Sequence, residues 1–137
     1  MKVSLKRVND AAHLIATNEF GNTISIDGSA EVGGQDLGFR PMQLVLAGLG
    51  SCSTMDVLHI LNKQKEPVQN IEIEVTGKRA DATPAVFTHI HVNFKISGKV
   101  NPEKAERAID LSMTKYCSVT KMLEPTVEIT HSFQIED

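Results

Sequence analysis

The stretch Pro41 to Lys63, with the sequence PMQLVLAGLGSCSTMDVLHILNK, predicts one long apolar helix at the centre of the fold. Proline is tolerated at the first position of a helix because its missing N–H has no partner there, and Lys63 lies near the negative end of the helix dipole. Apolar side chains occur on nearly every face, which is typical of a buried helix. Glycine inside a helix costs about 1 kcal/mol relative to alanine. Gly48 and Gly50 therefore indicate that another helix or backbone approaches closely around Cys52.

The segments on either side of this helix show both strand and helix patterns. Alternation of apolar and polar residues over 68–79 and 86–98 predicts two antiparallel strands with one solvated face. Asn101 and Pro102 are a cap and a first-turn proline, which predict the start of a helix. Further expected elements are short strands within 1–35, helices to about 115 and over 117–123, and a closing strand over 127–135. This order predicts a single α+β domain, residues 1–137, with antiparallel sheets around the long buried helix.

Composition and charge exclude several classes of function. A chain of 137 residues with 41% hydrophobic residues is expected to form one packed domain. The net charge of -3, with interspersed charges, leaves no basic face for nucleic acid and no polybasic membrane anchor. The first residues carry no signal-peptide pattern, and the longest mainly apolar run, Leu44 to Cys52, is too short to span a bilayer. We therefore expect a cytoplasmic protein whose thiols are reduced at rest.

Cys52 and Cys117 are the two cysteines of the chain, and both lie in apolar segments. They are either two buried structural residues or a redox pair, and the residues alone leave both interpretations open. A redox thiol must be ionised at working pH, whereas an apolar environment raises its pKa. A nearby cation is therefore required if Cys52 is reactive. Arg40, just before the long helix, is the arginine nearest to Cys52 in sequence and is the candidate for this role.

Three histidines suggest a metal-binding alternative. His89 and His91 are two residues apart on one predicted strand, so their side chains project from the same face. A third ligand, such as His131, has to come from elsewhere in the chain. The competing interpretation is a solvated strand face, which we favour because no other metal-binding motif accompanies the histidines.

Two polar residues follow Cys52 on the long helix. His59 comes seven residues later, about 10 Å along the axis, which is too far for a thiolate–imidazole pair. Asp56, one turn from Cys52, opposes ionisation of the thiol rather than favouring it. Both residues are therefore interpreted as structural.

The two cysteine segments together resemble the OsmC/Ohr family. In that family a Pro-x-x-Leu sequence starts a long central helix and a cysteine follows eleven residues after the proline, a spacing that Pro41, Leu44 and Cys52 share. The second cysteine of the family lies on a later helix, where Cys117 fits, with Ser118 in place of the usual proline. The match covers nearly the whole chain. It is most similar to the YhfA-like branch at four places: Met42 after Pro41, Phe87 to Ile90, Tyr116 to Val119, and Ile129 to Ser132.

This resemblance implies a fold, an assembly and a chemistry. It implies an OsmC-like fold in an intertwined homodimer with two active sites at the subunit interface. Cys52 is then the thiolate that attacks an organic hydroperoxide and becomes a sulfenic acid, Cys117 converts it into a disulfide, and an external dithiol reductant restores both thiols. No metal, flavin or haem is implied. The expected function is a cysteine-based peroxidase in oxidative-stress defence.

Two positions depart from the family pattern and keep a second hypothesis open. The peroxidase branches of the family use an arginine from the N-terminal hairpin, but residues 11–27 contain none. A glutamate that holds this arginine follows the proline, and here Met42 occupies its place. Arg40 is the candidate substitute for the arginine. The alternative is an OsmC-like protein that binds a small apolar ligand or senses redox state.

Overall fold

The computed structural model describes all residues from Met1 to Asp137. The chain divides into two compact units, Met1–Val45 and Leu46–Asp137. Each unit contains one three-stranded sheet, and helices account for much of the remaining chain. The α+β class predicted from the sequence is therefore confirmed.

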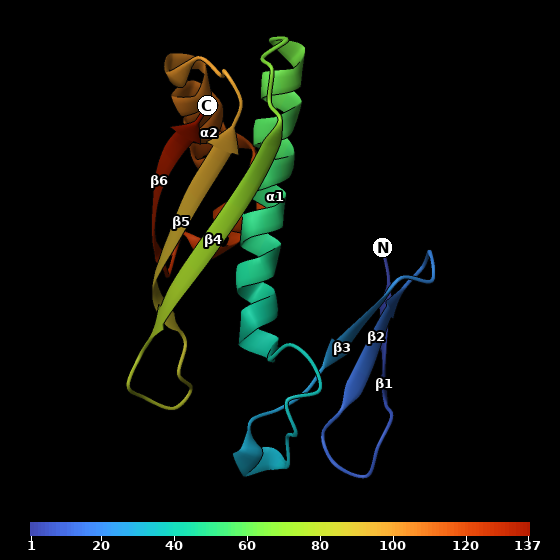
Figure 1. Ribbon diagram of the computed structural model, residues 1–137. Helices are drawn as coiled ribbons and strands as arrows, with labels where there is room; N and C mark the ends of the chain where they lie inside the picture. The colour runs from blue at the N-terminus through green and yellow to red at the C-terminus, as the bar shows by residue number, and fades with distance from the viewer. The chain divides into compact units, whose positions relative to one another are not determined.

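The first unit is an antiparallel sheet followed by a loop. Its strands are β1 Val3–Arg7, β2 Leu14–Asn18 and β3 Thr23–Ile26, in the order β1-β2-β3 (Figure 1). These are the short strands expected within residues 1–35. A short 3₁₀ helix, η1 Ala30–Val32, lies in the loop between β3 and the long helix.

Asp27 organises that loop. Its carboxylate accepts hydrogen bonds from the backbone N–H groups of Gly28, Gln35 and Leu37, at 2.8, 2.9 and 3.2 Å. These bonds, led by the one from Gln35, lower the pKa of Asp27 against the opposing effect of its burial. The buried carboxylate therefore stays ionised at neutral pH and holds the loop that leads to Arg40.

The long helix α1 spans Pro41–Lys63, the bounds predicted from the sequence, and belongs to the second unit from Leu46 onward. It is not buried on all faces within the chain, because the sheet of the second unit covers only one side of it. Met55, on another face, is 66% exposed. Within the single chain the buried residues form one stripe of Leu49, Gly50, Ser53, Val57 and Leu61, and burial of the other faces stays a prediction that requires a second copy.

The helix α1 is also long and apolar enough to cross a membrane, with a mean hydropathy of 1.6 over 18 residues. The unbroken apolar run from Leu44 to Cys52 underestimates the apolar length of this helix. Isolated polar residues interrupt the run but lower the mean hydropathy of the helix only slightly. Length and composition are weak grounds for a membrane span, since the core helix of a soluble protein meets the same criteria. A Cβ atom on Gly50 would lie 2.8 Å from Val75 Cγ2, so α1 packs directly on a strand, as a core helix does.

The sheet of the second unit consists of β4 Asn70–Arg79, β5 Phe87–Ser97 and β6 Glu128–Glu136, in the order β4-β5-β6. Figure 1 shows α1 running along this sheet. Strands β4 and β5 are antiparallel, as predicted, whereas β6 runs parallel to β5. The prediction of antiparallel pairing is wrong for β6 alone, because the helices between β5 and β6 carry the chain back to the end of the sheet where β5 begins.

Three helical segments connect β5 to β6. They are α2 Pro102–Leu111, the π-helix η2 Ser112–Tyr116 and α3 Ser118–Leu123. Asn101 caps α2 by accepting hydrogen bonds from the N–H groups of Glu103 and Lys104, as its sequence context predicts. The core between these segments, α1 and the sheet contains completely buried apolar side chains, among them Val57, Leu61, Val92, Phe94, Ile96, Ala105, Ala108 and Ile109.

Candidate active site at the two cysteines

Cys52 lies in the middle of α1, among residues with small side chains, and is partly exposed. The neighbouring serines turn their hydroxyl groups back onto carbonyl oxygens of the helix, Ser51 to Ala47 at 2.7 Å and Ser53 to Leu49 at 2.9 Å. These local bonds satisfy the two hydroxyl donors.

Cys117 lies where η2 ends and α3 begins. Its N–H donates to the Ser112 carbonyl oxygen at 2.8 Å, and this five-residue spacing is that of a π turn. Its sulfur accepts a hydrogen bond from the Thr120 N–H at 3.4 Å and so caps α3. The side chain is completely buried. The predicted start of this helix at Cys117 is confirmed to within one residue, with the cysteine as its cap.

The structure brings the two thiols together, although they are distant in sequence. The Cys52 thiol lies close enough to Cys117 to affect the pKa of the Cys117 thiol, and neither cysteine is in a disulfide. Burial raises the pKa of the Cys117 thiol; the hydrogen bond from Thr120 opposes this rise, and the adjacent Cys52 adds to it. Cys117 is therefore protonated at neutral pH. Cys52 is the more exposed of the two and is the thiol that a reagent from solvent reaches first.

A buried serine connects the two segments that carry the cysteines. The hydroxyl group of Ser112 is 2.9 Å from Asp56 Oδ2 and 3.2 Å from the carbonyl oxygen of Ser53. Asp56 and Ser53 lie on α1 close to Cys52, while Ser112 begins the π-helix that leads to Cys117. A hydrogen bond to a charged acceptor contributes about 1.5–3 kcal/mol. Ser112 therefore fixes the position of one thiol relative to the other.

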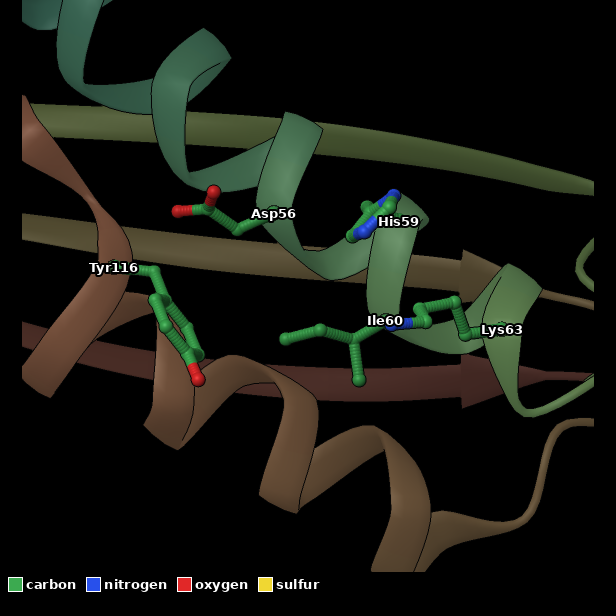
Figure 2. Close-up of a pocket in the computed structure, with 5 residues that line it drawn as sticks. All are labelled: Asp56, His59, Ile60, Lys63 and Tyr116. Carbon is green, nitrogen blue, oxygen red and sulfur yellow. The ribbon is translucent and has the colours of Figure 1, made fainter.

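A pocket of about 430 Å³ lies between α1 and η2, on the segments that carry the two cysteines (Figure 2). Asp56 follows Cys52 by one helical turn and Tyr116 directly precedes Cys117, so the pocket and the thiols are neighbours in the fold. One face of α1 forms one wall, and Tyr116 from η2 stands opposite. The lining residues are Asp56, His59, Ile60, Lys63 and Tyr116.

The interpretation of Asp56 and His59 as purely structural is therefore incomplete. It considered only whether either residue could activate the Cys52 thiol. Spacings of three, four and seven residues after Asp56 place the other α1 residues of the pocket on the same helix face, and this signal was available in the sequence. The contribution of Tyr116 was not, because it depends on how η2 packs against α1.

Arg40, the predicted activating cation, immediately precedes α1. Its guanidinium Nη2 is 2.9 Å from Asp36 Oδ1, and its backbone N–H donates to Gln43 Oε1, also at 2.9 Å. The Arg40 side chain is 40% exposed and that of Asp36 is 85% exposed. The role of Arg40 at the thiols stays a prediction.

The three histidines of the metal-binding alternative have separate partners. The ring nitrogens of His91 lie 2.7 Å and 2.8 Å from the hydroxyl groups of Thr130 and Ser132. His89 forms an ion pair with a glutamate of β6 at 2.8 Å. His131 pairs in register with Val92, whose side chain is buried, so it projects from the opposite face of the sheet to His91. The three rings therefore cannot share one metal ion, and no group of three metal-binding side chains forms anywhere in the chain.

Comparison with known proteins places this chain in a family. Residues 33–132 match the family model described as OsmC-like protein. The chain is 40% identical to Protein YhfA of Escherichia coli strain K12 over 116 residues, which are 84% of each protein. A crystal structure of a hypothetical protein from Aquifex aeolicus VF5 is 32% identical, with a TM-score of 0.86 over 98% of this chain and 95% of that one.

A more distant structure has the same fold. An organic hydroperoxide resistance protein OsmC from Legionella pneumophila is 18% identical, with a TM-score of 0.72 over 98% of this chain and 97% of that one. The family model and the relative at 40% identity confirm the resemblance seen in the two cysteine segments. The chain belongs to the family of OsmC-like proteins.

Proposed function

We propose that the protein is a thiol-dependent peroxidase that reduces organic hydroperoxides with Cys52 and Cys117. The observation that carries this proposal is the contact between two free thiols, one partly exposed and one buried. A disulfide forms only between sulfurs that can meet without large movement of the backbone. The name of the Legionella pneumophila neighbour, an organic hydroperoxide resistance protein, supports the choice of substrate. The cycle suits the reducing cytoplasm, where thiols are regenerated after each oxidation.

The proposed cycle has three steps. The Cys52 thiolate attacks the distal oxygen of the hydroperoxide and breaks the O–O bond; the sulfur becomes a sulfenic acid, and the alkoxide takes up a proton and leaves as an alcohol. The Cys117 sulfur then attacks the sulfenic sulfur, which forms the disulfide and releases water. An external dithiol donates two electrons and two protons, restores both thiols and becomes a disulfide itself.

The environments of the two thiols suit different roles in this cycle. Cys117 is buried and protonated, so it is protected from direct oxidation by the peroxide. It is also a neighbour of Cys52 before any reaction, so the resolving step requires little rearrangement. Cys52 is partly exposed and is the sulfur that the hydroperoxide can approach.

Arg40 is the cation that we propose to stabilise the Cys52 thiolate. Its ion pair with Asp36 is exposed, and exposed pairs contribute only about 0–1 kcal/mol, so the guanidinium can exchange this partner at low cost. Titration of the thiolate absorbance in the wild-type protein and in Arg40→Met tests the role. The proposal requires a higher Cys52 thiol pKa in the variant, whereas an unchanged titration curve removes Arg40 from the site.

We further propose a homodimer in which a second copy covers the open side of α1. Outside the adjoining residues and backbone of α1 itself, no atom of the chain lies within 4 Å of the position that a Cβ atom on Gly48 would take, although glycine costs the helix about 1 kcal/mol. The exposed Met55 lies on the same helix. Sedimentation equilibrium at low micromolar concentration should show no monomer, and Gly48→Leu should weaken the association. A stable folded monomer contradicts this part of the proposal.

Stopped-flow measurement of thiol oxidation by an alkyl hydroperoxide tests the peroxidase function. We expect oxidation faster than that of a free thiol, and steady turnover when a dithiol reductant is supplied. Cys52→Ser is the control and should reduce the rate to the uncatalysed level. Turnover that survives in Cys52→Ser, or a wild-type rate no faster than that of a free thiol, removes the proposal.

A small-molecule binding protein is the second candidate, and one feature of the structure favours it. An apolar groove of about 330 Å³ lies between α1 and β4, and it is lined by Ala47, Gly50, Ser51, Thr54, Met55, Ile73 and Val75. Native mass spectrometry of the freshly purified protein distinguishes the two functions. A bound apolar molecule together with thiols that do not react with hydroperoxide supports the binding protein over the peroxidase.

A further inference from the structure

Two charged side chains of the pocket beside the thiols have no partner of opposite charge. None of the eight ion pairs of the chain includes Asp56 or Lys63. The Asp56 carboxylate accepts a hydrogen bond from the neutral hydroxyl group of Ser112 at 2.9 Å, which leaves its charge uncompensated. The pocket therefore offers one anionic and one cationic group to a ligand.

These two charges lie at different ends of the pocket. Asp56 and Lys63 are seven residues apart on α1, about 10 Å along the helix axis. Long side chains on a helix lean towards its N-terminus, and Figure 2 shows the Lys63 side chain folded back towards Ile60. Ile60 lies between the charges, and the Tyr116 ring stands on the opposite wall, below Asp56 in Figure 2. The pocket thus has an anionic end near Cys52, an apolar middle and a cationic end.

We propose that this pocket binds a zwitterionic ligand of amino-acid or short-peptide size, with its ammonium group at Asp56 and its carboxylate at Lys63. The volume of about 430 Å³ is within the range of small-molecule sites. A ligand with a single charge leaves one charged group of the pocket without a partner, whereas a zwitterion pairs with both. The ammonium end of the ligand then lies next to the thiol pair.

Binding of the zwitterion does not depend on the peroxidase function, but the ligand's role in the redox cycle rests on that proposed function. The zwitterionic head group belongs either to the hydroperoxide substrate, an oxidised amino acid or peptide, or to a thiol reductant. As substrate, the ligand gives one oxygen atom to Cys52 and leaves as a hydroxy amino acid. As reductant, two thiol molecules reduce the disulfide through a mixed disulfide, return two hydrogens to the protein sulfurs and leave as their own disulfide.

Binding is tested first, without redox chemistry, by calorimetric titration of the Cys52→Ser protein. The probe is L-leucine; N-acetyl-leucine lacks its ammonium group and leucinamide lacks its carboxylate. We expect leucine to bind, and each blocked form to bind about fivefold more weakly, the effect of one charge pair. Equal affinities for the three compounds, or no saturable binding of leucine, overturn the proposal.

Matched variants assign each charge to its partner. Lys63→Gln should remove the difference between leucine and leucinamide and keep the difference between leucine and N-acetyl-leucine. Asp56→Asn should do the reverse, while its amide oxygen still accepts the Ser112 hydrogen bond. Lys65→Gln, an exposed lysine outside the pocket, is the control and should retain both differences. Variants at 56 and 63 that retain both differences overturn the assignment.

Two rate measurements on protein with both cysteines identify the source of the head group. The first compares an amino-acid hydroperoxide with tert-butyl hydroperoxide, and the second compares reduction of the preformed disulfide by cysteine and by cysteamine, which lacks the carboxylate. In one of these two comparisons the zwitterionic compound should react faster than its partner compound, and this difference in rate should disappear in Lys63→Gln. No advantage in either rate overturns the role in the cycle. Failure to reduce even tert-butyl hydroperoxide counts against the peroxidase function and leaves the binding result standing.

Discussion

The cysteine pair and the histidine pair of this chain lie in opposite environments. Cys52 and Cys117 come from distant segments, meet near the core and have each other as partner. His89 and His91 project from the exposed face of β5. Their ring nitrogens contact hydroxyl and carboxylate groups of β6. The sequence left a redox pair open for the two cysteines and favoured a solvated strand face for the H-x-H pattern. The structure brings the two thiols together and gives the two histidine rings partners on β6.

The difference between the two regions shows what marks a reactive site in this fold. Groups that are already satisfied by neutral or charged neighbours are held in place and have little left to offer a ligand. The thiols have weak partners, and the nearby charges of Asp56 and Lys63 have no partner of opposite charge. Matched variants, one in each region, therefore test whether the chemistry belongs to the cysteines.

The largest contrast is expected in peroxide reduction. Cys52→Ser removes the attacking sulfur and should abolish turnover, and Cys117→Ser should allow one oxidation but prevent formation of the intramolecular disulfide. His91→Ala should retain the wild-type rate, because His91 lies on the other face of the sheet from the helices that carry the thiols. The measurement is hydroperoxide consumption with a dithiol reductant. A large loss of rate in His91→Ala contradicts the assignment of the chemistry to the cysteines.

The next contrast concerns two serine hydroxyl groups. Ser112→Ala removes a buried bond to Asp56 and should lower the free energy of unfolding by about 1.5–3 kcal/mol. Ser132→Ala removes the exposed bonds to Asn93 and His91 and should change it by about 0.5 kcal/mol or less. Urea denaturation measures both. Ser112→Ala should also slow disulfide formation after oxidation, since its hydroxyl group aligns the two cysteine segments; equal effects of the two variants on stability and rate contradict this role.

A smaller contrast is expected in the pH dependence of stability. Because the pKa of Cys117 is raised in the folded protein, folding favours the protonated thiol. This contribution is fully present below the unfolded thiol pKa of about 8.5 and is lost as the pH rises from there through the raised folded value. Thermal denaturation of the reduced protein between neutral and alkaline pH should therefore show a steeper loss of stability than Cys117→Ala. Parallel pH profiles for the two proteins contradict the burial effect.

The smallest effect is expected at the histidine pair itself. The ion pair of His89 with Glu128 joins side chains that are 56% and 66% exposed. Such pairs contribute about 0–1 kcal/mol, so His89→Ala should change the free energy of unfolding by about 0.5 kcal/mol or less. Urea denaturation at neutral pH is sufficient. A destabilisation as large as that of Ser112→Ala contradicts the interpretation of this face of β5 as a solvated surface that contributes little to stability.

Much of the fold could be predicted from local signals in the sequence. The bounds of α1 follow from a first-position proline and a terminal lysine, and the start of α2 follows from Asn101 and Pro102. These signals act within one or two turns and need no knowledge of the rest of the chain. The exposed and buried alternation of β4 and β5 was predictable for the same reason.

Features that depend on distant packing could not be predicted in the same way. The parallel pairing of β6 is set by the crossover through α2, η2 and α3 rather than by the composition of the strand. The contact of the thiols arises from η2, whose π turn at Ser112 has no evident sequence signal. The pairing of Cys52 with Cys117 followed from the resemblance to the family and not from the residues alone. The pocket at Asp56 was missed because its second wall, Tyr116, comes from another segment.

The most direct test of the central claim is to treat the fully reduced protein with one equivalent of an alkyl hydroperoxide and to map its thiols by mass spectrometry. We expect an intramolecular disulfide between Cys52 and Cys117 in the wild-type protein, and in Cys117→Ser a sulfenic acid on Cys52 that a dimedone probe captures. Oxidation that begins at Cys117, or two thiols that remain free while a simple thiol control is oxidised, contradicts the account.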